Sequence, residues 1–149
     1  MSWIKEEPYN YSWWESLCIR LLRTGSVPKH IAFIMDGNRR YAKRLGIDKI
    51  KGHSEGFEKL AQTLQWCHDL GISEVTVYAF SIENFKRPQA EVDALLELAK
   101  EKFEHLIKEK DRLEENGVRV NVIGNLALLP TDLQLLVDKA TSLTKHNTK

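Results

Sequence analysis

The chain has 149 residues, of which 42% are hydrophobic, so it is long enough for one domain with a substantial core. Its 22 basic and 21 acidic side chains give a formal net charge of +1, which excludes the strongly basic composition typical of nucleic-acid-binding proteins. No apolar run approaches the roughly 20 residues that cross a bilayer, and neither Cys18 nor Cys67 has a Cys or His at zinc-site spacing. We therefore expect no transmembrane span, no zinc site and a reducing compartment.

The first predicted element is an amphipathic helix. Ser12 and Glu15 have the spacing of a capping box, apolar side chains follow at helical intervals, and Gly25 ends the pattern. We therefore interpret residues 1–25 as an N-terminal helical segment and residues 26–149 as the domain that follows. Tryptophans in or before this helix suit either packing on the domain or contact with a membrane surface. They are Trp3, Trp13 and Trp14.

The rest of the chain alternates predicted strands and helices. In chain order they are a strand at 31–35, a basic helix at 38–45, a helix ending at Gly71, a strand at 74–80, a helix over 92–113, a strand at 118–123 and a helix beginning at Thr131. This alternation predicts the α/β class, with a parallel sheet and flanking helices. The strand at 31–35 is apolar without alternation, which is typical of burial on both faces. Because three strands make a thin sheet, we expect the C-terminal half of the domain to be missing.

Two polar clusters directly follow the first two predicted strands, at 36–40 and 81–87. Parallel sheets bind ligands outside the carboxyl ends of their strands, so both clusters are candidate ligand sites. Asp36 is suited to holding magnesium, and the helix that begins at Asn38 offers amide and guanidinium donors to a diphosphate. The alternative is a plain turn and helix cap with solvated arginines.

Three segments resemble signatures of the cis-prenyltransferase family. The first is His30 to Ala42, HIAFIMDGNRRYA, and the second is Tyr78 to Arg87, YAFSIENFKR. Between them stands Gly52-His53, with Gly56 just beyond. The segments occur in the family order, and the resemblance extends from residue 28 to about residue 145. Arg39 and Phe85 are similar to the residues of animal dehydrodolichyl diphosphate synthases.

The resemblance implies a magnesium-assisted prenyl transfer that supports dolichol synthesis and protein glycosylation. Farnesyl diphosphate would be extended with isopentenyl diphosphate to a long-chain cis-polyprenyl diphosphate. Asp36 would hold Mg²⁺, and Asp36 and Asn84 would be the catalytic residues. The implied substrate-binding residues are Gly37, Asn38, Arg39, Arg40, His53, Ser81, Phe85 and Arg87. It also implies a heteromer with a Nogo-B receptor-like subunit, or a homodimer, in peripheral contact with the cytosolic face of the endoplasmic reticulum membrane.

Departures from the family pattern leave alternatives open. Lys49 stands where the family usually has Arg, and an ammonium group cannot reproduce a bidentate phosphate contact. The chain ends before the family's arginine-serine segment for isopentenyl diphosphate, so we expect it to be inactive alone. A truncated or non-catalytic subunit is the main alternative. A lone histidine such as His53 is also often structural. An aspartyl-nucleophile phosphatase would need an acid at position 34, where this chain has Ile34.

Overall fold

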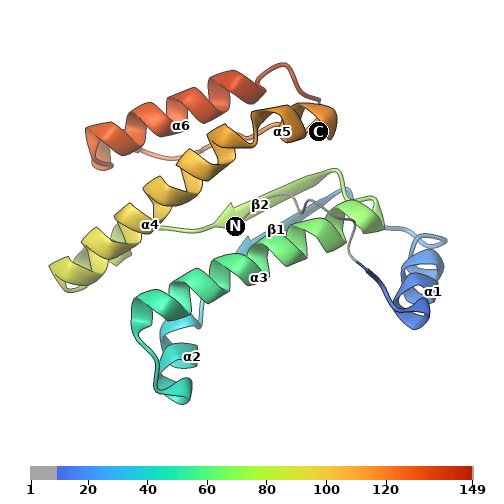
Figure 1. The fold of residues 1–149 in the computed structure, drawn as a ribbon, viewed down its shortest axis with the longest axis horizontal. Coiled ribbons are helices and arrows are strands. Elements are labelled where there is room, and N and C mark those ends of the chain that lie inside the picture. Colours follow the sequence, from blue (N-terminus) through green and yellow to red (C-terminus); the bar gives the residue numbers. More distant parts are fainter. Residues whose placement is uncertain (1–9, 149) are drawn as a thin grey trace. The chain divides into compact units, whose positions relative to one another are not determined.

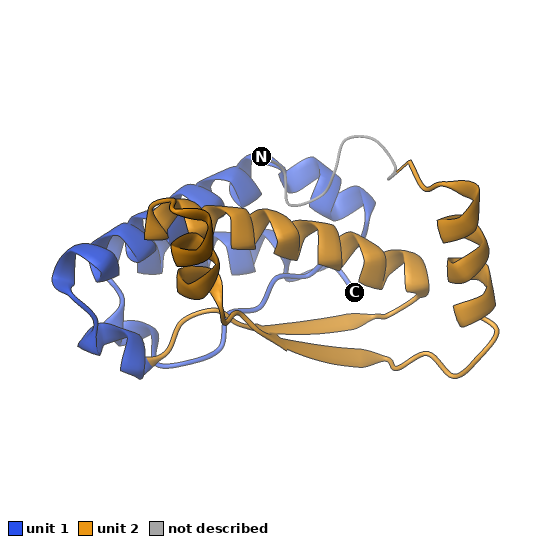
Figure 2. Ribbon diagram, turned by 90° about the horizontal axis from the view of Figure 1, so that it is seen from below, with its two compact units in different colours: residues 1–4, 82–149 blue, residues 5–81 orange. Residues whose placement is uncertain are grey.

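The computed structural model describes residues 10–148, which form two compact units, 10–81 and 82–148. Figure 2 shows the two units in different colours. Trp3, which we considered as a membrane-facing residue, lies outside the described residues. No helix among residues 10–148 is both long enough and apolar enough to cross a bilayer.

The unit 10–81 contains a parallel two-stranded sheet and three helices (Figure 1). Its elements are α1 (Trp13–Leu22), β1 (His30–Ile34), α2 (Asn38–Leu45), α3 (Lys49–Leu70) and β2 (Glu74–Tyr78). The strands pair in parallel from His30 opposite Glu74 to Ile34 opposite Tyr78. The crossover helix α3 runs along one face of this sheet (Figures 1 and 2). This arrangement confirms the predicted α/β class.

The N-terminal helix begins as predicted. Ser12 Oγ accepts from the Glu15 backbone N–H, and the Glu15 carboxylate accepts from the Ser12 N–H at 2.8 Å, which completes the capping box. The hydrogen bond from the Ser12 backbone N–H to the carboxylate also lowers the pKa of Glu15. Tyr11 ties the start of the helix to α3 by donating its hydroxyl hydrogen to Asp69. No residue of α1 is buried, so the helix covers little of the unit.

Burial along β1 differs from the prediction that both its faces are covered. Ile31 and Phe33 are half-buried, whereas Ala32 and Ile34 are exposed. β2 has the same alternating pattern. The prediction of burial on both faces is therefore wrong for the described structure, because each strand alternates between a half-buried and an exposed side chain.

The unit 82–148 is helical. It contains η1 (Ile82–Lys86), α4 (Gln89–Lys108), α5 (Lys110–Glu115), η2 (Leu126–Leu128) and α6 (Thr131–Thr144). Its core joins α4, α5 and α6 through Leu106, Leu113 and Ala140. The helix that we predicted over 92–113 is interrupted at Glu109, whose backbone angles of φ −90° and ψ 18° end α4.

The predicted strand at 118–123 is not a strand in the described structure. Val118 and Val120 pack against the core of the unit, but no other strand pairs with the segment. Some of its backbone groups instead bond to side chains of α6 and of the residues after it. The Val120 N–H donates to Thr144 Oγ1 at 3.0 Å, and Asn147 Nδ2 donates to the Val118 carbonyl at 2.7 Å. Side chains thus replace the ladder that a strand would need.

Candidate active site

The first cluster begins where β1 ends. The Met35 N–H donates to the Tyr78 carbonyl at 3.1 Å, which extends the pairing with β2 by one residue. Gly37 then caps α2 with a φ of 92°, a value that side-chain-bearing residues rarely adopt. This turn brings Asp36 and the first amides of α2 to the carboxyl end of the strand. Such a position is typical of ligand sites in parallel sheets.

Asp36 is an exposed carboxylate surrounded by donors. Its Oδ1 accepts from the Gly37 N–H at 2.6 Å, and its Oδ2 accepts from Arg40 Nη2 at 3.0 Å. The Asp36 side chain is 77% exposed, so an ion or anion in solvent can reach it. The guanidinium of Arg40 and the N-terminal amides of α2 therefore lie beside a carboxylate, which suits joint binding of a cation and an anion.

His53 reaches the same place from α3. Its Nδ1 lies 3.4 Å from Asn38 Nδ2, and its Nε2 is buried. Both residues are partly buried. The structure therefore brings Asp36, Gly37, Asn38, Arg40 and His53 together within one unit. Arg39 stands in the first turn of α2 and is exposed.

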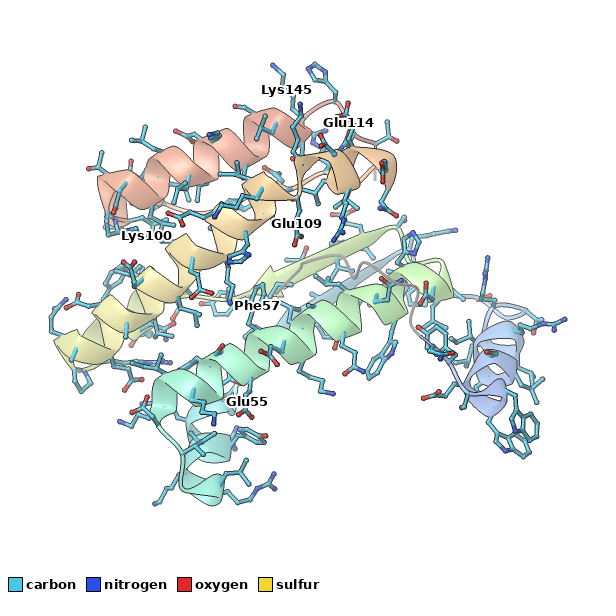
Figure 3. The ribbon with its side chains drawn as sticks, viewed as in Figure 1. Glu55, Phe57, Lys100, Glu109, Glu114 and Lys145 are labelled. Atoms are coloured by element: carbon cyan, nitrogen blue, oxygen red, sulfur yellow. The ribbon has the colours of Figure 1, made fainter. Side chains whose placement is uncertain are left out.

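A shallow hollow of about 280 Å³ lies beside this cluster, lined by Gly37, Arg40, Tyr41 and Arg44. Tyr41 donates its hydroxyl hydrogen to Glu55 Oε2 at 2.8 Å, and this hydrogen bond raises the pKa of Tyr41. Glu55, labelled in Figure 3, stands at the end of α3 that lies beside α2. Tyr41, Arg44 and Glu55 were not among the site residues predicted from the sequence. The i, i+4 spacing of Arg40 and Arg44 was the available signal for a basic face.

The residues of the second cluster, 81–87, belong partly to each unit of the chain. Ser81 follows β2, whereas Asn84 and Phe85 lie on the short helix η1 of the unit 82–148. Arg87 stands just before α4, and its Nη1 donates to Glu91 Oε1 at 3.2 Å. The side chains of Arg87 and Glu91 are 21% and 7% exposed. Glu91, which we did not predict, therefore fixes a candidate substrate-binding arginine.

Magnesium is implied by the resemblance, and the donors present fit it. Proteins commonly hold Mg²⁺ with one or two carboxylates and complete its shell with water and substrate phosphates. Within residues 10–148, no group of three or more His, Cys, Asp or Glu side chains is arranged to hold a metal ion. Asp36 offers one accessible carboxylate next to anion-binding groups. This donor set suits an ion shared with a diphosphate rather than a metal site made only of protein.

Comparison with known proteins identifies the family of this chain. Residues 34–149 match the family described as "Putative undecaprenyl diphosphate synthase". The chain belongs to the cis-prenyltransferase family. This cis-prenyltransferase chain is 56% identical over all its 149 residues to the Homo sapiens protein named dehydrodolichyl diphosphate synthase complex subunit DHDDS, of which it covers 44%. It is 48% identical over 135 residues to a Pyrococcus horikoshii tritrans,polycis-undecaprenyl-diphosphate synthase, matching 91% of this chain and 51% of that protein.

A solved structure supports the same assignment. The chain is similar, with a TM-score of 0.74 and 30% identity, to lavandulyl diphosphate synthase from Lavandula x intermedia in complex with dimethylallyl diphosphate. The match covers 80% of this cis-prenyltransferase chain and 50% of that chain. The chain thus spans about half the length of the relatives that it matches.

Proposed function

We propose that this chain supplies the allylic-diphosphate site of an enzyme that makes long-chain cis-polyprenyl diphosphates for dolichol synthesis. The observation that carries the proposal is the convergence of Asp36, the N-terminus of α2, Arg40 and His53 at the end of β1. A carboxylate, backbone amides and a guanidinium together match the charges of a magnesium diphosphate. The names of the relatives, which are prenyl diphosphate synthases, support this class of substrate.

In the proposed reaction, the bond between C1 of farnesyl diphosphate and its diphosphate oxygen breaks, and the diphosphate leaves with the electron pair. The terminal alkene carbon of isopentenyl diphosphate bonds to C1, and a proton passes from the isopentenyl unit to a neighbouring base. Mg²⁺, held by Asp36 and the diphosphate, would supply positive charge to the leaving group. Arg40 and the amides of α2 would bind the same group, and Arg39 would extend the basic surface.

The second cluster would act on the reacting ends of the substrates. We assign Asn84 a catalytic role and Ser81, Phe85 and Arg87 substrate-binding roles, as the resemblance implies. The ring of Phe85 offers an apolar wall that would keep water from a carbocation. Arg87, oriented by Glu91, would direct its remaining donors to a phosphate.

We further propose that the enzyme works at the cytosolic face of the endoplasmic reticulum membrane with a Nogo-B receptor-like subunit, or as a homodimer. The name of the Homo sapiens relative, which describes it as a complex subunit, supports an assembly. The exposed side chains of Trp13 and Trp14, at 66% and 60%, support contact between α1 and a lipid surface.

A hybrid enzyme tests the proposed function. The chain replaces the matching 149 residues of the Homo sapiens relative, and transfer of radiolabelled isopentenyl diphosphate to farnesyl diphosphate is measured with Mg²⁺. We expect elongation by the hybrid and its loss in Asp36→Ala. A well-folded hybrid that binds diphosphate without elongating it would instead support the non-catalytic alternative. In parallel, the 149-residue chain alone is titrated with farnesyl diphosphate, which we expect it to bind.

A further inference from the structure

Two glycines lie inside the longest helix of the chain. Gly52 and Gly56 are four residues apart in α3, which continues unbroken for 22 residues to Leu70. Glycine within a helix costs roughly 1 kcal/mol relative to alanine, so two of them weaken α3 unless their small size is needed. Residues at i and i+4 share one helix face. That face lies against α2, where the candidate diphosphate-binding residues stand.

Gly52 sets how closely the two helix backbones approach. A Cβ at Gly52 would lie 2.7 Å from the Asn38 carbonyl oxygen and 2.8 Å from the Cβ of Ala42, which is completely buried. Neither atom can rotate away, because one belongs to the backbone and the other is fixed to it. A side chain at position 52 would therefore force the helices apart.

Gly56 contacts a different part of the same residue. A Cβ at Gly56 would collide with the Asn38 side-chain amide, meeting Oδ1 and lying 2.8 Å from both Cγ and Nδ2. Asn38 Nδ2 also lies 3.4 Å from His53 Nδ1. The amide of Asn38 thus lies against both Gly56 and His53, two residues of α3. Because the amide is the end of a rotatable side chain, a methyl group at position 56 would displace the amide rather than the helix.

We propose that Gly56 is a positioning residue that holds the Asn38 amide in its orientation for binding a diphosphate oxygen. The identity of the ligand rests on the proposed function, whereas the orientation of Asn38 rests on the packing of α2 against α3. Gly52 supports the same helix pair through the backbone, so the two glycines should respond differently to the same substitution. Gly56→Ala should change ligand binding, and Gly52→Ala should change stability.

The test uses the 149-residue chain and three measurements. These are calorimetric titration with inorganic diphosphate and Mg²⁺, thermal unfolding, and the ¹⁵N–¹H resonances of the Asn38 side-chain amide. Gly25→Ala is the matched control, because a Cβ there meets only the Leu22 carbonyl oxygen at the ordinary distance of 3.7 Å. We expect Gly56→Ala to weaken diphosphate binding about tenfold or more, as Asn38→Ala does, since a hydrogen bond to a charged group is lost. Its melting temperature should be equal or higher, because alanine favours the helix.

The double variant Asn38→Ala/Gly56→Ala separates positioning from other effects. If Gly56 acts through Asn38, Gly56→Ala weakens binding no further when Asn38 is already alanine. Independent, additive losses would overturn the proposal, and so would unchanged Asn38 resonances in Gly56→Ala or a melting temperature lowered as far as in Gly52→Ala. If the wild-type chain fails to bind diphosphate, the proposed function is contradicted. The Asn38 resonances then still decide the positioning role, since a shift supports it and their constancy refutes it.

Discussion

Because Arg87 forms an ion pair with Glu91, its contribution to the stability of the chain can be measured separately from its role in substrate binding. The two side chains are 3.2 Å apart, and Glu91 is only 7% exposed. Arg87→Met leaves this carboxylate buried without its guanidinium. Breaking a buried pair in this way typically costs about 3 to 5 kcal/mol. We expect a loss at the lower end of this range, about 3 kcal/mol. Glu91 lies in the first turn of α4, where the helix dipole partly stabilises the unpaired carboxylate.

The compensating variant is Arg87→Met/Glu91→Leu. Replacing both members of a buried ion pair with apolar side chains of similar size is often neutral or stabilising, so the free energy of unfolding should return to within about 1 kcal/mol of the wild type. For a unit of this size, a 3 kcal/mol loss lowers the melting temperature by about 12 °C or more. The double variant should therefore be as stable as the wild type while lacking the guanidinium.

Urea unfolding of the 149-residue chain, followed by circular dichroism, measures the loss of stability in Arg87→Met and its recovery in the double variant. Prenyl transfer by the hybrid enzyme, with the concentration of isopentenyl diphosphate varied, measures the role of Arg87 in substrate binding. If Arg87 binds substrate, the stable double variant has a raised Michaelis constant or no turnover. Normal kinetics in the double variant would limit Arg87 to a structural role. A loss below about 1 kcal/mol in Arg87→Met would refute the reasoning from burial, because exposed pairs contribute that little.

Three further variants probe other parts of the chain. Asp36→Asn should remove the magnesium dependence of inorganic diphosphate binding, and equal enhancement of binding by Mg²⁺ in calorimetry would contradict this. The same variant should change the free energy of unfolding by less than about 1 kcal/mol, because the ion pair of Asp36 with Arg40 is exposed. Asp132 accepts a hydrogen bond at 2.7 Å from Lys100, labelled on α4 in Figure 3, and this contact lowers the pKa of Asp132. Its stabilising contribution is therefore present above the unfolded pKa and lost as the pH falls through the folded pKa, so acid should destabilise the wild type more steeply than Asp132→Asn; parallel pH profiles in urea unfolding would refute the link. Trp13→Ala/Trp14→Ala should reduce flotation with vesicles of phosphatidylcholine and phosphatidylserine relative to Trp66→Ala on α3, and equal flotation would assign the pair to packing.

Elements with strong local signals were predictable from the sequence. The helix at 38–45 is confirmed as α2, and the Ser12–Glu15 capping box is confirmed at the start of α1. In each case the signal lies within a few residues. Glycines with positive φ, Gly37 and Gly46, stand at the two ends of α2, and two side chains three residues apart cap α1. Such signals do not depend on the rest of the chain.

The wrong predictions concern features that depend on distant partners. Residues 118–123 have the valines and isoleucine of a strand, but a strand forms only beside another strand. Here the hydroxyl of Thr144 takes the Val120 N–H instead, 24 residues away in sequence. Similarly, no glycine or proline marks the break at Glu109 between α4 and α5. The prediction that both faces of β1 are buried was wrong because apolar composition does not reveal which face is covered.

The site itself was only half predictable, because α3 packs against α2 through a face that carries no hydrophobic signal. Hydrophobic periodicity identified the side of α3 that carries Leu60 and Cys67, whereas the side facing α2 presents Gly52, Glu55 and Gly56. These residues act through close approach and one hydrogen bond to Tyr41, so they contribute little apolar burial. Helix propensity therefore offers no reason for this combination, since alanine at both positions would favour an isolated helix. The placement of a ligand-binding turn does offer one, because contacts that cost helix stability are expected where geometry matters more than burial.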